Sequence, residues 1–331
     1  MKALVTGASG FLGRQIVAQL CARGDNVRGF SRRATPELER IGVDCRRGDL
    51  RDASAVAEAC RDREVVFHCA AVAGIWGRWD HYFGINVQGT QHLIQACRTM
   101  SVAAIVYTSS PSVTFDGTPQ RGVNEQVGYA RHWLCHYPHS KALAEQSVLA
   151  ADQPGGLRTC ALRPHLIWGP GDEHLIPRLI DRARRGQLRQ VGDGTNRIDI
   201  THVENAALAH LLAAYQLLSV RAVGGKAYFI SQGESVNCWQ WINELLSMHG
   251  LPPVRRKISL DWAWRIGAVL EFLHRAARSE KEPRMTRFLA AQLALDHYFD
   301  IGRAQRDFAY QPRISTAQGM HDLAACLGRR K

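Results

Sequence analysis

Tyr137 and Lys141 are spaced for acid–base chemistry. They begin and end the sequence YPHSK, and on a helix this spacing places both side chains on one face. A free phenol has a pKa of about 10 and exchanges protons poorly at neutral pH unless a nearby cation lowers that pKa. We therefore expect Tyr137 to act as a catalytic acid or base with Lys141 as its partner, on a helix over residues 137–151.

A hydroxyl-rich segment could supply the second part of such a site. The sequence VYTSSPSV ends an apolar run, and a hydroxyl there can hydrogen-bond a substrate carbonyl and stabilise the charge that develops on its oxygen. We assign this role to Ser110 and a structural role to Ser109. Asn86 is a further candidate, which either positions a cofactor or a proton-relay water or caps a helix. Both roles remain open.

A glycine-rich segment near the start of the chain predicts a dinucleotide site. TGASGFLG lies between an apolar strand at Lys2–Thr6 and a helical pattern at Arg14–Arg23. In this fingerprint the first glycine forms a tight turn and the second lets the backbone approach a pyrophosphate at the helix N-terminus. The third permits close packing of helix on strand. The predicted cofactor-binding residues here are Gly7, Gly10, Phe11, Leu12 and Gly13.

The end of the second strand favours NADP over NAD. NAD-binding proteins usually place an acid about 20 residues after the glycines, where it holds the ribose hydroxyls. This chain has Arg32 and Arg33 there instead. Guanidinium groups pair with phosphate in a bidentate manner, so these two arginines suit the 2′-phosphate of NADP.

Two later strand ends fit the same cofactor. Asp49 and Leu50 follow a third expected strand, where an acid can meet the adenine amine. Ala70 and Ala71 end the next strand and leave room for a ribose. These four residues are included in the predicted cofactor site.

Strands and helices alternate along the chain, and the strands are continuous apolar runs. This pattern is typical of a parallel sheet covered on both faces, so the expected fold is a doubly wound α/β sheet of Rossmann type with a smaller C-terminal substrate lobe. We expect residues 1–170 to form the dinucleotide domain, including the Tyr/Lys helix, and residues 171–331 to form the lobe, partly interleaved with the sheet. Further strands are expected at Asn26–Ser31, Val65–Cys69, Ala104–Thr108, Thr159–Ile167 and Ala227–Ser231, and helices at Ala53–Cys60 (capped by Asp52), Ile85–Met100, Leu175–Arg185, Val203–Leu218 and Cys238–His249.

The net charge and the cysteines limit the kinds of partner and the location that we expect. The net charge of +12 favours acidic partners, such as a phosphorylated cofactor or a carboxylate substrate. The basic residues form only short groups without a nucleic-acid motif, so no nucleic-acid partner is expected. Nine scattered cysteines indicate free thiols, no metal site and a reducing, cytoplasmic location. No leader or spanning segment is expected. The amphipathic stretch Trp262–Arg278 is a core or lid helix, or a surface that contacts lipid, and we prefer the first.

The motifs together resemble the extended short-chain dehydrogenase/reductase family. Within it, YPHSK resembles the 3β-hydroxysteroid dehydrogenase branch, and the resemblance is closer still to bacterial reductases of olefin biosynthesis. The segments that carry it are VYTSSPSVT, LRPHLIWGPGD, KAYFIS, TRFLA and RDFAY. The resemblance implies that Tyr137, Lys141 and Ser110 are catalytic and that the backbone at Pro164 meets the nicotinamide. Two residues depart from the reductase pattern: His165 stands where an Arg is expected, and Ser110 where a Thr is expected.

The resemblance also implies a reaction. NADPH-dependent reduction of a 2-alkyl-3-oxo acid would give a 2-alkyl-3-hydroxy acid, as in long-chain olefin biosynthesis. The partner would be a small hydrophobic keto acid, and a homodimer or a place in a biosynthetic assembly remains open. Candidate apolar walls for the alkyl chains are Trp76, Trp79, Tyr82, Trp168 and the helix after Trp262.

Three alternatives share parts of this pattern. A 3β-hydroxysteroid or sterol dehydrogenase would use the same residues, although the missing acid argues against NAD. A sugar-nucleotide epimerase shares the catalytic set but not the C-terminal motifs. A non-catalytic NADP-sensing regulator would not need Tyr137, Lys141 and Ser110 together.

Overall fold

The computed structural model describes residues 1–219 and 223–328 and is built around a seven-stranded parallel sheet. The strand order is β12-β7-β5-β4-β1-β2-β3, and each neighbouring pair is parallel. From β1, the strands β2 and β3 therefore follow in order toward one edge of the sheet. The strands β4, β5, β7 and β12 then follow in order toward the other edge. A crevice opens at such a switch point, beyond the carboxyl ends of the strands. The strands are β1 (Lys2–Thr6), β2 (Asn26–Ser31), β3 (Asp44–Arg47), β4 (Val65–His68), β5 (Ala104–Thr108), β7 (Arg158–Pro164) and β12 (Lys226–Ile230).

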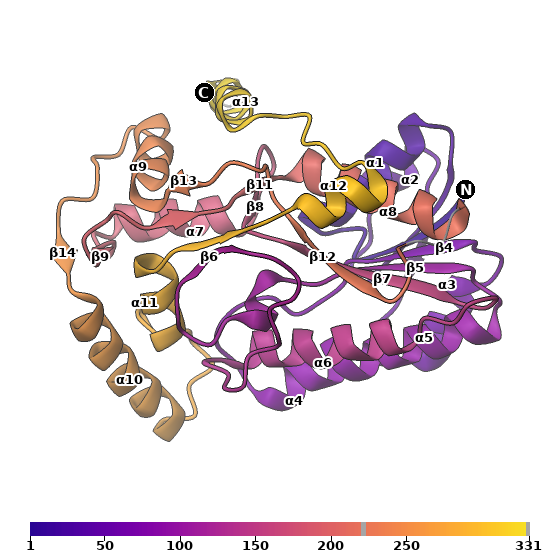
Figure 1. The fold of residues 1–331 in the computed structure, drawn as a ribbon, viewed down its shortest axis with the longest axis horizontal. Coiled ribbons are helices and arrows are strands. Elements are labelled where there is room, and N and C mark those ends of the chain that lie inside the picture. The colour runs from indigo at the N-terminus through magenta and orange to yellow at the C-terminus, as the bar shows by residue number, and fades with distance from the viewer. Residues whose placement is uncertain (220–222, 329–331) are drawn as a thin grey trace.

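Helices cover both faces of this sheet (Figure 1). One face carries α1 (Phe11–Ala22), α8 (Val203–Ser219) and α12 (Gly302–Phe308), with the short α2 (Pro36–Glu39) near β3. The other face carries α3 (Ala53–Cys60), α5 (Gly89–Thr99) and α6 (His136–Ala150). The predicted doubly wound fold is confirmed.

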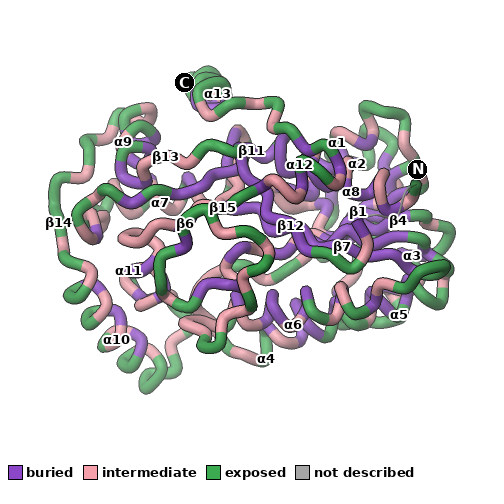
Figure 2. The backbone as a smooth tube through the Cα atoms, viewed as in Figure 1, coloured by how far each residue is buried: buried purple, intermediate pink, exposed green. Residues whose placement is uncertain are grey.

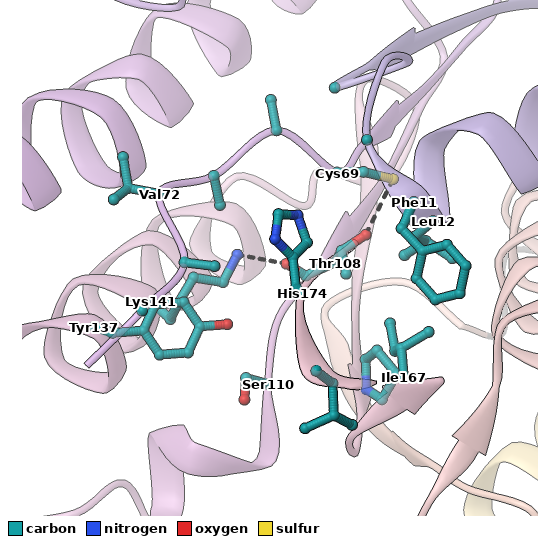
Figure 3. A pocket seen from close by; sticks show the side chains of 18 of the residues that line it. Phe11, Leu12, Cys69, Val72, Thr108, Ser110, Tyr137, Lys141, Ile167 and His174 are labelled. Atoms are coloured by element: carbon teal, nitrogen blue, oxygen red, sulfur yellow. Dashed lines mark hydrogen bonds between the residues drawn. The ribbon is translucent and has the colours of Figure 1, made fainter. Parts of the chain in front are cut away.

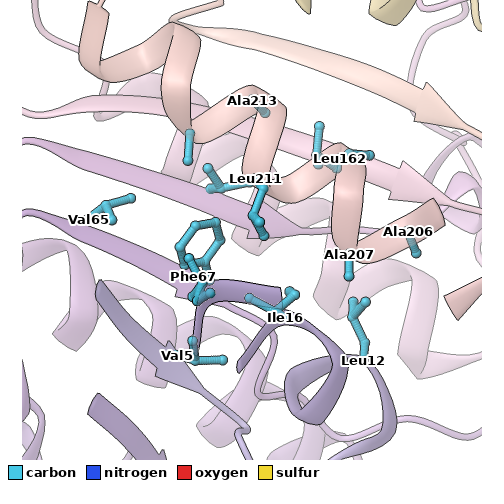
Figure 4. Packing of buried hydrophobic residues seen from close by; sticks show 14 of the residues in the cluster. Val5, Leu12, Ile16, Val65, Phe67, Leu162, Ala206, Ala207, Leu211 and Ala213 are labelled. Atoms are coloured by element: carbon cyan, nitrogen blue, oxygen red, sulfur yellow. The ribbon is translucent and has the colours of Figure 1, made fainter. Parts of the chain in front are cut away.

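Alternate residues of each strand supply the two cores. Ala3 and Val5 of β1 belong to the cluster under α1 and α8, whereas Leu4 belongs to the cluster under α3, α5 and α6. Figure 4 shows Val5, Phe67 and Leu162 meeting residues of α1 and α8. The central strands β4, β5 and β7 are therefore buried on both faces, which explains why they read as continuous apolar runs rather than as alternating ones. The edge strand β3 is partly exposed.

The rest of the chain forms a smaller lobe beyond the carboxyl ends of the strands. Its helices are α7 (Leu175–Arg184), α9 (Cys238–Met248), α10 (Leu260–Ala276), α11 (Arg287–Ala294) and α13 (Thr316–Gly328). Its short strands are β6 (Gln120–Val123), β8 (Ile167–Trp168), β9 (Gln190–Val191), β10 (Arg197–Ile198), β11 (Thr201–His202), β13 (Val236–Asn237), β14 (Lys257–Ile258) and β15 (His297–Phe299). A separate core of this lobe surrounds Trp168 and Trp241.

The chain passes between the two parts several times. β6 leaves the first half to join β15 in the lobe, whereas α8 and β12 return to the main sheet.

Two expected elements are interrupted. The helix expected over 85–100 begins within a π-helical turn at Phe83–Gln88 and continues as α5, and the short α4 (Trp79–Tyr82) precedes the turn. The strand expected over 159–167 ends at Pro164 and resumes as β8 at Ile167, because Leu166 takes a positive φ of 39°. Gly84 lies within the π-helical turn and Gly89 begins α5, whereas the break at Leu166 has no glycine at the residue with positive φ.

The amphipathic stretch after Trp262 forms α10, whose inner side contributes Ala263 and Trp264 to two core clusters. One face packs on α11, and exposed positions recur along the other (Figure 2). None of its residues lines the cavity described below.

Candidate active site

A cavity of about 1100 Å³ lies at the switch point and runs into the lobe. Each predicted site residue except Asn86 lines it. Those residues are Gly7, Gly10, Phe11, Leu12, Gly13, Arg32, Arg33, Asp49, Leu50, Ala70, Ala71, Ser110, Tyr137, Lys141 and Pro164. The volume exceeds the roughly 300–1,000 Å³ typical of a site for one small ligand.

The glycine turn has the geometry of a pyrophosphate cradle. Gly7 has a φ of +69°, and a Cβ there would lie 2.9 Å from backbone atoms of Ala70. A Cβ on Gly13 would lie 2.1 Å from the Gly7 carbonyl oxygen. Gly10 is the N-cap of α1 and provides no side-chain cap, so a bound anion could accept from the free N–H groups of the first turn. The turn therefore fits a dinucleotide.

Exposed arginines stand at the end of β2. Arg32 and Arg33 both line the cavity, and backbone atoms of their loop are fixed by two contacts. Ser31 Oγ donates to the Arg33 carbonyl at 2.7 Å, and Arg47 Nε donates to the Arg32 carbonyl at 3.1 Å. The two guanidinium groups thus extend from an ordered loop.

The Asp49 carboxylate is hydrogen-bonded to the nearby Arg51. Its carboxylate accepts from Arg51 Nε at 3.0 Å and from Arg51 Nη2 at 2.8 Å. These hydrogen bonds lower the pKa of Asp49 to about 2. Asp49 is therefore an anion at the cavity wall, where its predicted contact is with adenine.

Tyr137, Lys141 and Ser110 come together at the carboxyl end of β5 (Figure 3). α6 presents the first two one turn apart, and β5 leads into Ser110. Lys141 Nζ donates to the Thr108 carbonyl at 2.5 Å and lies 4.2 Å from the centroid of the Tyr107 ring. The expected convergence of the three residues is therefore present.

Burial dominates the proton affinities of this pair. It lowers the pKa of Lys141 to about 7, against the opposing effects of Cys69 and Glu145. It raises the pKa of Tyr137 to about 12, although a hydrogen bond with Ser110 acts in the opposite direction. Lys141 is not among the groups that shift the pKa of Tyr137 here, and the expected lowering of this pKa by Lys141 together with an oxidised nicotinamide stays a prediction. At neutral pH Tyr137 carries its proton.

The two serines at the end of β5 have different surroundings, and the catalytic role expected of Ser110 stays a prediction. Ser110 is the N-cap of the 3₁₀-helix at Pro111–Thr114, and its Oγ lies 2.9 Å from Ser112 Oγ. Ser109 is buried, and its N–H donates to the Leu162 carbonyl at 2.6 Å, which ties β5 to β7. Ser112 also lines the cavity and was not anticipated, although it lies in the same hydroxyl-rich motif.

Asn86 does not cap a helix, and its expected role in positioning a cofactor or a relay water stays a prediction. It lies inside the π-helical turn, away from any helix end, and does not line the cavity. Its side chain accepts from Val72 N at 2.7 Å and donates to the Val72 carbonyl at 3.1 Å and to Ser140 Oγ at 2.9 Å. Asn86 thus joins the cavity-lining segment at Val72 to α6 beside Lys141.

A buried ion pair lies behind the catalytic helix. Glu145, one turn after Lys141, accepts from Arg163 Nη2 at 2.5 Å and from the Tyr129 hydroxyl at 2.8 Å. Arg163 immediately precedes Pro164 on β7. Neither residue was predicted, although a charged pair inside two apolar elements is itself a signal, because such charges are rarely buried without a partner.

The apolar wall differs from the one expected. Trp76, Trp79, Tyr82 and Trp168 do not line the cavity. Trp168 is in the lobe core, Trp79 stacks on His139 at 4.7 Å, and the Tyr82 hydroxyl donates to backbone carbonyls. The aromatic wall consists instead of Phe11, Phe30, Phe115, Phe288 and Phe299. Segments distant in sequence contribute these rings, so no local motif marks them.

Two histidines lie in this wall. The rings of His165 and His297 are 4.7 Å apart, and both line the cavity. His165 Nδ1 lies 2.6 Å from the Asp199 carbonyl oxygen, and His297 Nε2 lies 2.8 Å from the Gln292 carbonyl oxygen. Burial lowers the pKa of His165 to about 3 and that of His297 to about 4, so both are neutral at pH 7. His165 therefore does not replace the positive charge of the expected Arg.

Metal-ligand clusters are absent from the described ranges: no group of three or more His, Cys, Asp or Glu side chains there could hold a metal ion.

Relatives match essentially the whole chain. The 2-alkyl-3-oxoalkanoate reductase of Stenotrophomonas maltophilia is 47% identical over 327 residues, covering 98% of this chain and 99% of that protein. The protein of the same name from Shewanella oneidensis is 45% identical, covering 98% of this chain and 86% of its own. The decarboxylating sterol-4-alpha-carboxylate 3-dehydrogenase of Mus musculus is 32% identical, covering 97% and 91%.

A solved structure agrees with this fold. MoeE5, in complex with UDP-glucose and NAD, superposes with a TM-score of 0.76 at 27% identity, covering 100% of this chain and 99% of that one. Residues 4–260 match the 3-beta hydroxysteroid dehydrogenase/isomerase family. With its glycine turn, its Tyr–Lys helix and these relatives, the chain belongs to that family.

Proposed function

We propose that this protein reduces a 2-alkyl-3-oxoalkanoate to the 2-alkyl-3-hydroxyalkanoate with NADPH. One observation carries the proposal: Tyr137, Lys141 and Ser110 face the same cavity as the glycine turn. Full-length similarity to two 2-alkyl-3-oxoalkanoate reductases supports the substrate class.

The residues of the chain would divide the work as follows. Tyr137 carries its proton at neutral pH, because its pKa is about 12, and donates it to the ketone oxygen. The Ser110 hydroxyl donates a hydrogen bond to the same oxygen and stabilises its developing charge. Lys141 would bind the ribose hydroxyls of the cofactor. NADPH, when bound, supplies the hydride that reduces the ketone carbon.

The preference for NADPH rests on Arg32 and Arg33. Both are exposed at the cavity wall and extend from an ordered loop. The remaining predicted residues would hold the rest of the cofactor: the glycine turn the pyrophosphate, Asp49 and Leu50 the adenine, and the backbone near Ala70, Ala71 and Pro164 the ribose and nicotinamide. Asn86 would act indirectly, by holding Val72 in place.

The lobe would bind the acyl chains. We assign residues 1–170 to the cofactor and residues 171–331 to the substrate, with Phe288 and Phe299 as walls from the second part and Phe115 as a wall from the first. Such a reaction suits long-chain olefin biosynthesis in the cytoplasm, with the protein as a homodimer or part of an enzyme assembly.

A sterol dehydrogenase is the second candidate. The name of the mouse relative places a carboxylate on carbon 4 and oxidation at carbon 3. In a 2-alkyl-3-oxoalkanoate the carboxylate likewise sits on the carbon next to the reacting one. The two candidates therefore share a β-keto acid and differ in the rest of the molecule.

Initial rates test the proposal directly. The absorbance of the reduced nicotinamide would be followed with NADPH and with NADH, against a freshly prepared 2-alkyl-3-oxo acid and a 3-oxosteroid. An enzyme-free sample corrects for spontaneous decarboxylation of the keto acid. We expect fastest turnover with NADPH and the open-chain acid. If only the steroid is turned over, the protein is a sterol dehydrogenase. If NADPH binds but neither ketone is turned over, the protein is a sensor of NADPH.

A further inference from the structure

Helix α10 presents a stripe of large apolar side chains to solvent. Among the described residues, six large hydrophobic side chains are exposed, and five of them lie on this helix. Their spacing of three and four residues places them along one side. We call these five residues the α10 stripe: Trp262 (61% exposed), Ile266 (40%), Val269 (57%), Phe272 (70%) and Leu273 (53%).

The opposite side of the helix fixes this orientation. Gly267 lies so close to α11 that a Cβ there would be 2.7 Å from the backbone carbon of Thr286. The buried Glu271 carboxylate accepts from Arg287 N at 2.7 Å, from its Nε at 3.0 Å and from its Nη2 at 2.8 Å. Rolling the helix to bury the α10 stripe would break all of these contacts. The contacts between α10 and α11 therefore keep the α10 stripe exposed to solvent.

Positive charge surrounds the α10 stripe. Residues 255–284 contain eight Lys and Arg residues against four Asp and Glu. Two of those acids are paired, Glu271 with Arg287 and Glu282 with Arg178 and Arg182. The eight basic residues are all exposed, and they are Arg255, Arg256, Lys257, Arg265, Arg275, Arg278, Lys281 and Arg284.

We propose that the α10 stripe lies in the surface of a bilayer that contains anionic phospholipid. A helix with an apolar face and flanking Lys and Arg is suited to the plane of the interface. The guanidinium of Arg265 is 5.7 Å from the centroid of the exposed Trp262 ring, a combination that suits the boundary between headgroups and acyl chains. Within the described ranges, no helix is long and apolar enough to cross the bilayer, so contact would be in the plane.

A second copy of the chain is less suited than a bilayer to cover the α10 stripe. A symmetric contact through the α10 stripe would bring the two sets of flanking basic residues toward each other, and like charges at an interface oppose association. An anionic surface instead complements them.

The inner side of α10 connects this surface to the cavity. Trp264 packs in a cluster with Phe115, Phe288 and Ile75, and the last three line the cavity. A bilayer-bound α10 would place the aromatic wall of the cavity next to lipid. A ligand with long alkyl chains could then pass between bilayer and cavity with little exposure to water.

Vesicle co-sedimentation of the full chain tests the proposal without any substrate, so its outcome is independent of the proposed reaction. The probes are vesicles of phosphatidylcholine alone and of phosphatidylcholine with phosphatidylglycerol, each at low and high salt. We expect binding to the anionic vesicles that weakens at high salt. Phe272→Gln should weaken it about tenfold or more, because a buried Phe side chain is lost from the interface. Ile41→Gln, which removes the one exposed large apolar side chain outside α10 among the described residues, should not.

A second set of variants, each with two substitutions, tests the contribution of the basic residues. Lys281→Gln with Arg284→Gln should weaken binding roughly 25-fold, since each basic residue near an anionic surface contributes about fivefold. Arg61→Gln with Arg98→Gln removes the same charge from exposed sites on α5 and at the end of α3 and should have little effect. Unchanged thermal unfolding shows that each variant is folded.

Two results would overturn the proposal. The first is a wild-type protein that stays in the supernatant with anionic vesicles, or a Phe272→Gln variant that sediments as wild type does. The second is a concentration-dependent dimer in analytical ultracentrifugation that Phe272→Gln abolishes, without vesicle binding by either protein. That result would assign the α10 stripe to a second copy.

Discussion

Glu145 and Arg163 form an ion pair at 2.5 Å whose side chains are 0% and 5% exposed. The pair links α6, one turn beyond Lys141, to the end of β7 at Pro164. It therefore braces the two elements that place the proposed proton donor and the proposed nicotinamide contact.

Breaking the ion pair between Glu145 and Arg163 should destabilise the folded protein. Glu145→Gln leaves a buried guanidinium without its counter-charge, and we expect the free energy of unfolding to fall by about 3–5 kcal/mol. Urea denaturation measures this loss. The exposed pair of Asp181 and Arg185 provides a control, because Asp181→Asn should cost no more than about 1 kcal/mol. Equal losses for the two variants would show that the buried pair does not brace the fold.

Tyr137→Phe should remove the proton donor and little else. We expect turnover to fall by about 10²–10⁴, the usual contribution of general acid catalysis, while the Kd for NADPH stays the same. Ser110→Ala should lower turnover by about 10²–10³ through lost stabilisation of the oxygen. Stopped-flow rates and fluorescence titration of NADPH report the two quantities. Tyr298→Phe, outside the cavity lining, is the matched control, and near wild-type turnover in Tyr137→Phe would place the proton donor elsewhere.

Lys141 should give the stability of the protein a distinct pH dependence. Its pKa in the folded protein is about 7 against an ordinary value of 10.5, so between these values the unfolded chain binds more protons. The burial of Lys141 therefore costs most stability below pH 7, and this cost shrinks as the pH rises toward 10.5. We expect the free energy of unfolding, relative to Lys141→Met, to rise by up to about 1.4 kcal/mol per pH unit across this window.

Chemical denaturation at several pH values would measure that difference. Lys226→Met is the control, since Lys226 is half-exposed and paired with Asp307 and should show little slope. A difference between wild type and Lys141→Met that does not change with pH would show that Lys141 remains protonated in the folded protein.

Arg32 and Arg33 should decide between the two nicotinamide cofactors. Replacing both with Ala should weaken NADPH binding by roughly tenfold or more, because a hydrogen bond to a charged group contributes about 1.5–3 kcal/mol. The Kd for NADH should change little. Arg61→Ala with Arg98→Ala controls for the loss of net charge. A constant ratio of the two Kd values would mean that these arginines do not contact the 2′-phosphate.

The sequence predicts the parts of this structure that depend on local pattern. Apolar runs bounded by glycine or by polar residues mark six of the seven main strands, and the polar β3 is the exception. Asp52 caps α3 as expected, because its side chain accepts from the Ser54 and Ala55 N–H groups. The glycine turn and the Tyr–Lys spacing are local as well. Each of these features is determined by residues within one turn or one strand of each other.

The features that escaped prediction depend on distant contacts. The cavity wall at Phe288 and Phe299 exists because β15 and α11 fold back on the first half of the chain. Asn86 is satisfied by Val72 and Ser140, which lie 14 and 54 residues away in sequence, so no local rule could exclude the capping role. The raised pKa of Tyr137 arises from burial, which spacing alone does not give.

The return of β12 to the edge of the main sheet has a consequence for synthesis. β12 pairs with β7 at residues 226–230, and α8 covers the same face that α1 covers. A ribosome that has released only residues 1–170 would leave β7 as an open edge and half of one sheet face uncovered, and open edges promote aggregation. The nascent chain would therefore have to wait for more than two-thirds of its length before the nucleotide-binding half could close, and this long interval is when a chaperone would be most needed.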